Sequence, residues 1–164
     1  MRNIRIVTLA LLLAACGTAD GTKGSTLEWR ALESGTEATG AEASGSDAAV
    51  RIATTPAHYR ELWNEIVGAK ERPQVDFERE SVIFLLLGTR STGGYAIEPK
   101  EVRSAKEGLD VSTHVTSPGK DTRVTQVITH PYAVIAVGRP DVDAVRWVED
   151  HGGELIAARQ RSGE

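Results

Sequence analysis

Residues 81–102 read SVIFLLLGTRSTGGYAIEPKEV, and the order of apolar and polar residues along them predicts a buried strand, a turn and a second strand. The first eight residues are almost continuously apolar, which is typical of a central strand buried on both faces of a sheet. A polar turn containing Gly93 and Gly94 follows, and alternation begins at Tyr95, which predicts a second strand. Pro99 within that strand predicts a sheet edge or a bulge, because proline lacks the N–H that a ladder uses.

Further strands are predicted on both sides of this stretch by alternating or continuous apolar runs. We expect them at residues 27–33, 48–55, 108–115, 122–130, 131–138 and 144–159, the last of these as a hairpin. Residues 34–47 are rich in Gly, Ser, Thr and Glu and predict a long exposed loop. An amphipathic helix is expected over about residues 55–68, where apolar residues recur at helical spacing after a Thr-Pro start. The sequence therefore predicts an all-β or β-rich α+β fold, an antiparallel β-sandwich-like domain with one helix.

The N-terminus has the layout of an export signal. Arg2 and Arg5 flank the start of an apolar stretch that is too short to span a bilayer and that ends in LAAC at residues 13–16. This ending resembles the lipobox of bacterial lipoproteins, which implies cleavage before Cys16 and acylation of that cysteine. An ordinary signal peptide with an incidental cysteine is the alternative.

The organisation that follows from the lipobox is a signal peptide at residues 1–15, a flexible tether at residues 16–26 and a single β-rich domain at residues 27–160. It predicts a protein anchored in the bacterial cell envelope, at the outer membrane facing the periplasm if the cell is Gram-negative. Cys16 is the only cysteine of the chain, so no intramolecular disulfide can form and stability must come from packing.

The sequence argues against the binding of phosphate groups or nucleic acids. Its net charge is −4 and no basic stripe is visible, which argues against nucleic acid as a partner. A phosphate loop needs Lys and Ser or Thr after its last glycine at the start of a helix, whereas a strand-like pattern follows Gly94. We therefore expect neither a nucleotide nor another cofactor.

The sequence also contains no recognisable motif for catalysis or metal binding. No GxSxG elbow is present, and the four histidines, at positions 58, 114, 130 and 151, show no HxxxH-type spacing. We expect no catalytic residues and no metal ligands, and hence a protein that is not an enzyme. An envelope enzyme or metal binder in which His114 and His130 meet across a hairpin is an alternative.

Several motifs occur in an order that resembles the C-terminal domain of the PrcB family, which is named for a subunit of a spirochaete surface protease complex. They are Asp76-Phe77, Gly88, the turn Thr92-Gly93-Gly94-Tyr95, and Pro131-Tyr132 before an apolar strand. The resemblance covers about residues 75–138. It implies a β-rich accessory module that binds a protein partner, an exported protease being the candidate, and that reaches the membrane only through acylated Cys16.

The turn around the glycine pair has two interpretations. It either shapes a corner between two strands or presents a surface to a partner, because functional contacts concentrate on loops held by rigid scaffolds. The loop at residues 117–121 and a later Arg-Pro loop are expected to face the same partner. The candidate partner-binding residues are Arg90, Ser91, Thr92, Gly93, Gly94, Tyr95, Arg139 and Pro140.

A second resemblance is to the Asn-Pro-Thr-Thr-Gly-Tyr loop of chagasin-type inhibitors of cysteine peptidases. Thr92, Gly94 and Tyr95 agree with that loop, whereas the residues at positions 90, 91 and 93 depart from it. The inhibitors also carry Arg-Pro followed by an aromatic residue, whereas Asp141 follows Arg-Pro in this chain. Direct inhibition of a cysteine peptidase through Thr92–Tyr95 is the alternative function that this resemblance implies.

Overall fold

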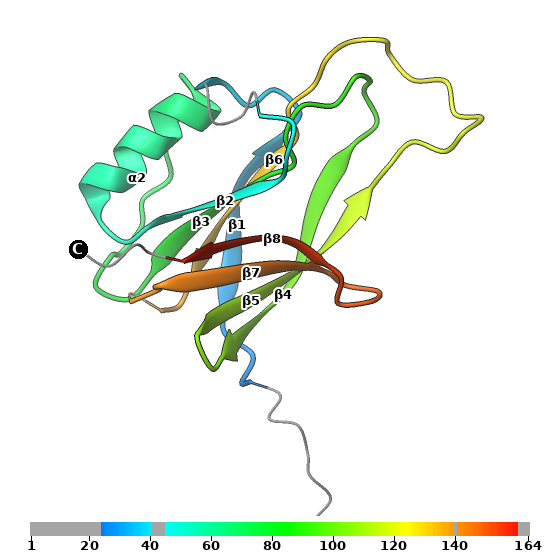
Figure 1. Ribbon diagram of the computed structural model, residues 1–164. Coiled ribbons are helices and arrows are strands. Elements are labelled where there is room, and N and C mark those ends of the chain that lie inside the picture. The colour runs from blue at the N-terminus through cyan, green and yellow to red at the C-terminus, as the bar shows by residue number, and fades with distance from the viewer. Residues whose placement is uncertain (1–23, 41–44, 140, 161–164) are drawn as a thin grey trace, which may run out of the picture.

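The computed structural model describes residues 24–40, 45–139 and 141–160, which form two four-stranded sheets (Figure 1). The first sheet has the strand order β1-β6-β3-β2 and the second has the order β4-β5-β7-β8. The strands are β1 (Trp29–Gly35), β2 (Ala49–Ala53), β3 (Ser81–Leu86), β4 (Ala96–Ala105), β5 (Gly108–Thr116), β6 (Tyr132–Val137), β7 (Ala144–Glu149) and β8 (Leu155–Gln160). One helical segment, α2 (Pro56–Leu62) continued by η1 (Trp63–Val67), lies between β2 and β3. The predicted β-rich fold with one helix is confirmed.

Strand β3 is central because its neighbours on the two sides are β2 and β6, both antiparallel. All of its residues are buried, as the continuous apolar run predicts. Ile83 and Leu85 belong to the core between the two sheets, whereas Phe84 belongs to the core under the helix. The alternation of side chains along a strand thus places one apolar run in two cores at once.

The helix covers the outer face of the first sheet (Figure 1). Thr55 caps it, because its Oγ1 accepts a hydrogen bond of 3.3 Å from the His58 N–H. Tyr59 and Trp63 contact each other edge to face, with ring centroids 5.6 Å apart. The last turn is a π-turn in which Gly68 N–H bonds the Trp63 carbonyl, and Gly68 ends the helix with a φ of +80°. The prediction for residues 55–68 is therefore confirmed.

The second sheet contains the only departure from antiparallel pairing among the described strands. Strand β4 lies at an edge and has an irregularity between Pro99 and Glu101, as the proline predicts. Strand β5 pairs antiparallel with β4 but parallel with β7. The parallel pair arises because the chain crosses to the first sheet as β6 before it returns as β7.

The strand predicted at residues 122–130 is wrong. The chain between β5 and β6 is a long irregular loop that projects from one end of the molecule (Figure 1). Its β-type backbone pairing consists of two isolated bridges, one between Thr129 and Arg90 and one between His130 and Glu37. Alternation alone does not make a strand, because a strand needs a partner along its length and this segment pairs only at these two bridges.

The loop predicted at residues 34–47 is shorter at its start than expected, because β1 extends to Gly35. Ala38 is buried, and Thr39 N–H donates a hydrogen bond of 2.8 Å to the Ile66 carbonyl at the end of the helix. These described residues are therefore held against the helix, in contrast to the exposed loop that the composition predicts.

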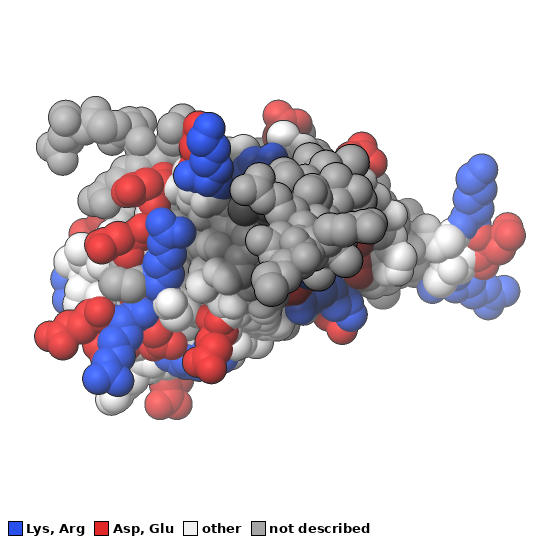
Figure 2. Space-filling view, turned by 90° about the horizontal axis from the view of Figure 1, so that it is seen from below, with Lys and Arg blue, Asp and Glu red and all other residues white. Residues whose placement is uncertain are grey.

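The lipobox and Cys16 lie in residues 1–23, outside the described residues, and Pro140 lies outside them as well. Within the described ranges, no helix combines the length and the apolarity that crossing a membrane requires. The face seen in Figure 2 mixes acidic and basic side chains, and the segment that projects furthest carries both signs.

Candidate functional site

The loop from Arg90 to Tyr95 begins where β3 ends, and Gly88 sets its direction. Gly88 has a φ of +79°, and the carbonyl oxygens of residues 45–47 lie within 2.9 Å of the position that a Cβ would occupy. Only glycine fits there, because any side chain would meet backbone atoms in a conformation that L-residues rarely adopt. Arg90 then exchanges two backbone hydrogen bonds with Thr129, of 2.8 and 2.9 Å.

The Thr92–Tyr95 turn is held against the long loop that joins β5 to β6. Gly93 N–H donates a hydrogen bond of 2.9 Å to the Thr125 carbonyl. The Thr129 hydroxyl donates one of 2.9 Å to the Thr92 carbonyl. A Cβ on Gly93 would lie 2.5 Å from Thr125 Oγ1, so a side chain there would force the Thr125 hydroxyl to turn away.

Gly94 and Tyr95 complete the turn. Gly94 is exposed and has a φ of +90°, and a Cβ there would lie 3.0 Å from a Val124 methyl and 3.2 Å from Pro118 Cβ. Tyr95 is half-buried against the core between the sheets, and the Arg90 guanidinium lies 5.7 Å from its ring centroid. The structure therefore brings Arg90–Tyr95 and the predicted 117–121 loop together on one surface.

Two further residues of this surface are not apparent from the sequence. Val127 and Ile128 are 54% and 69% exposed, although both are large and apolar. The sequence carries no clear signal for the pair, because adjacent apolar residues also occur in true strands of this protein, such as Trp147 and Val148 on β7.

Arg139 is not part of this surface. It follows the C-terminal end of β6, where its Nη1 donates a hydrogen bond of 3.2 Å to the Gly108 carbonyl, whereas Thr129 precedes the N-terminal end of the same strand. A strand of six residues is about 20 Å long, so the two ends lie far apart. Because β3 and β6 are antiparallel, the residues that follow these two strands lie at opposite ends of the sheet, so the structure does not bring Arg139 together with Arg90–Tyr95.

The histidines also meet in a different combination from the predicted one. The hairpin that would place His114 opposite His130 does not form, and His130 bonds through its backbone to residues 36 and 38. His114 lies instead beside Glu149, Asp150 and His151. The sequence gives no sign of this group, because 34 or more residues separate His114 from its neighbours.

The candidate surface is thus defined as the turn Arg90–Tyr95, the loop at residues 117–121 and the apolar pair Val127–Ile128. Its geometry supplies a rigid turn, an aromatic ring under a cation and two exposed apolar side chains. These are features that bind a protein surface, because exposed apolar groups on fixed loops gain free energy when a partner removes them from water.

Comparison with known proteins supports the family resemblance that the order of the sequence motifs suggests. Residues 81–138, which span β3 to the residue after β6, match the family model described as PrcB C-terminal. No curated protein matches the chain, and no solved structure does. The matched segment includes the whole candidate surface, and the chain therefore carries a PrcB C-terminal domain over residues 81–138.

Proposed function

We propose that this protein is a non-enzymatic accessory module that binds a protein partner, an exported protease being the candidate, and that acylated Cys16 anchors it to the cell envelope. The observation that carries the proposal is the exposed pair Val127–Ile128 beside a turn that backbone hydrogen bonds hold in place. A preformed turn loses little conformational entropy on binding, which leaves more of the contact energy for affinity. The resemblance to PrcB supports a protease complex as the setting.

The contact surface is tested by removing its apolar groups without disturbing the fold. The double variant Val127→Ser/Ile128→Ser should recover at least about tenfold less partner from cross-linked envelopes than the wild type, because central apolar contacts dominate interface energies. Leu155→Ser is the matched control, since Leu155 is 57% exposed and lies on β8, outside the candidate surface. Quantitative mass spectrometry of the captured proteins measures the effect. Equal recovery by the double variant and the wild type would exclude this surface as the contact.

The anchor is tested independently of the partner. Replacing Cys16 by serine removes the thiol that the lipobox would acylate, so the variant should leave the membrane fraction and lose incorporation of a palmitate analogue. Fractionation and labelling of the two proteins measure this directly. A variant that still sediments with membranes and carries the label would contradict the lipoprotein assignment.

Direct inhibition of a cysteine peptidase through Thr92–Tyr95 is the second candidate. The observation that favours it is the turn's position beside a projecting loop, since a protruding rigid edge can enter an active-site cleft (Figure 1). Arg139 lies at the other end of β6, so the turn would have to act without the Arg-Pro loop of chagasin-type inhibitors. Titration against a papain-like enzyme decides the matter, and a rate unchanged at micromolar protein would eliminate this function.

A further inference from the structure

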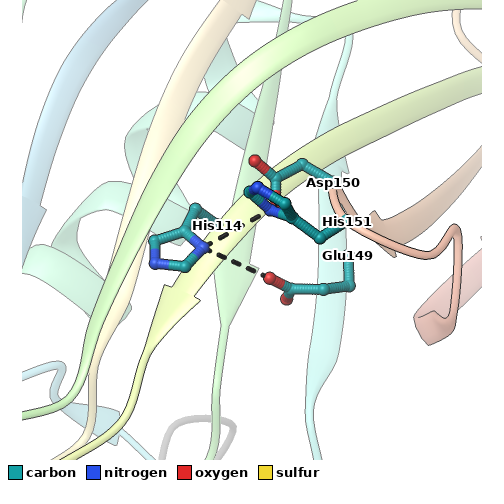
Figure 3. A group of neighbouring side chains, drawn as sticks. All are labelled: His114, Glu149, Asp150 and His151. Carbon is teal, nitrogen blue, oxygen red and sulfur yellow. Dashed lines mark hydrogen bonds and ion pairs between the residues drawn. The ribbon is translucent and has the colours of Figure 1, made fainter.

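Four side chains that can bind a metal converge at the end of the second sheet (Figure 3). His114 is on β5, Glu149 ends β7, and Asp150 and His151 begin the turn to β8. The parallel pairing of β5 with β7 is the cause, because it places the C-terminal ends of both strands at the same edge. One ligand atom from each of the four residues lies within 4.8 Å of the others.

The turn that carries three of these residues is fixed by backbone hydrogen bonds. Asp150 N–H donates one of 2.9 Å to the Thr113 carbonyl, and Gly153 N–H donates one of 3.0 Å to the Glu149 carbonyl. The Glu149 carboxylate also accepts a hydrogen bond of 3.4 Å from Val115 N–H. The group is therefore held by its scaffold, which is what a binding site requires and what a chance encounter of surface side chains lacks.

The Nδ1 atom of His114 points into the group and is an exception among the buried polar atoms. The His114 side chain is 42% exposed, but its Nδ1 is closed to solvent and makes no hydrogen bond. The nearest oxygens are those of Glu149 at 3.5 Å and Asp150 at 3.6 Å. A buried nitrogen without a hydrogen bond is costly, and this one faces two carboxylates at ion-pair distances, an arrangement that a bound cation would satisfy.

We propose that His114, Glu149, Asp150 and His151 bind a divalent transition metal of the zinc class. In a tetrahedral zinc site with bonds of 2.0–2.2 Å, neighbouring ligand atoms are about 3.3–3.6 Å apart. The separations of 3.5 and 3.6 Å around His114 Nδ1 match this spacing, whereas they are too long for hydrogen bonds.

The chemical types of the four ligands indicate which metal the site would bind. Two imidazoles favour zinc and its neighbours over Ca²⁺ and Mg²⁺, which prefer oxygen ligands. Two carboxylates neutralise the charge of a divalent ion when both histidines are neutral.

The metal competes with one contact that the group makes by itself. His151 Nδ1 and Asp150 Oδ1 contact each other directly. A divalent ion would replace that contact and would draw His114 Nδ1 to the same centre. His151 is 79% exposed, so its ring is free to turn toward the ion from the solvent side.

Calorimetric titration of zinc into the purified protein, prepared without a histidine tag and treated with chelator, tests the site. We expect one equivalent to bind with a Kd below about 10 µM. His114→Ala and His151→Ala should each weaken binding at least about tenfold, since even outer-shell changes weaken metal sites by this much. His58→Ala is the control, because His58 is an exposed histidine on α2 and should leave the Kd unchanged.

A second measurement guards against variants that fail to fold. Zinc should raise the melting temperature of the wild type and of His58→Ala, because a ligand that binds only the folded state stabilises it. It should not raise that of Glu149→Gln, which keeps the size of the side chain and removes its charge. A Kd weaker than about 10 µM, or equal affinities for the wild type and both histidine variants, would overturn the site.

Discussion

Replacing Trp147 by alanine should lower the free energy of unfolding by about 4–5 kcal/mol, which is a large part of the stability of an ordinary domain. Trp147 is fully buried on β7 in the core between the two sheets. Its Nε1 donates a hydrogen bond of 2.6 Å to the Thr113 hydroxyl, which is also buried. The substitution therefore leaves both a cavity and a buried hydroxyl without its partner.

Urea denaturation followed by circular dichroism measures the loss. Trp147→Phe separates its two causes, because phenylalanine fills most of the space and cannot donate to Thr113. We expect this variant to lose about 1–3 kcal/mol, the cost of an unpaired buried group and a smaller cavity. If Trp147→Ala lost less than about 2 kcal/mol with an unchanged m-value, the packing described for this core would be contradicted.

Replacing Gly108 by alanine should destabilise the protein by about 3 kcal/mol or more, through backbone strain and a direct clash. Gly108 begins β5 and has a φ of +126°, where side chains are strongly disfavoured. A Cβ there would lie 2.1 Å from the Ala144 carbonyl oxygen at the start of β7. The substitution must therefore push β5 and β7 apart where their parallel pairing begins.

Gly152→Ala is the matched control for this strain. A Cβ at Gly152 would meet nothing within 4 Å, so the free energy of unfolding should stay within about 0.5 kcal/mol of the wild type. Hydrogen exchange of the amides in β5 and β7 should rise in Gly108→Ala and remain unchanged in Gly152→Ala. Equal stability of the two variants would show that the β5–β7 junction differs from the one described.

Elements that depend on local physics were predictable from the sequence. The helix follows from a threonine cap, a proline at its start and apolar residues at helical spacing, none of which needs a distant partner. The burial of β3 follows from eight nearly continuous apolar residues, because such a run cannot leave one face in water. The irregularity of β4 follows from Pro99, which cannot donate to a ladder.

The candidate surface was predictable in part. The turn at Gly93 and Gly94 is predictable because glycine adopts backbone conformations that are closed to other residues, and Gly94 adopts one of them, with a φ of +90°. The neighbouring pair Val127–Ile128 is not predictable as part of the surface, because its sequence is typical of a strand. The two side chains are exposed because this segment lies outside the strands of both sheets. Arg139 looked like a neighbour because it also follows a strand, and only the direction of β6 shows that it lies at the opposite end.

The helix, the buried central strand, the glycine turn and the resemblance to PrcB each follow from residues that lie close together along the chain. The parallel pairing of β5 with β7, which brings His114 to Glu149, Asp150 and His151, is visible only in the folded molecule. Strand order depends on which crossover lets both sheets bury their apolar faces together. The free energy gained by this burial depends on contacts throughout the packed molecule, so no single stretch of the chain predicts it.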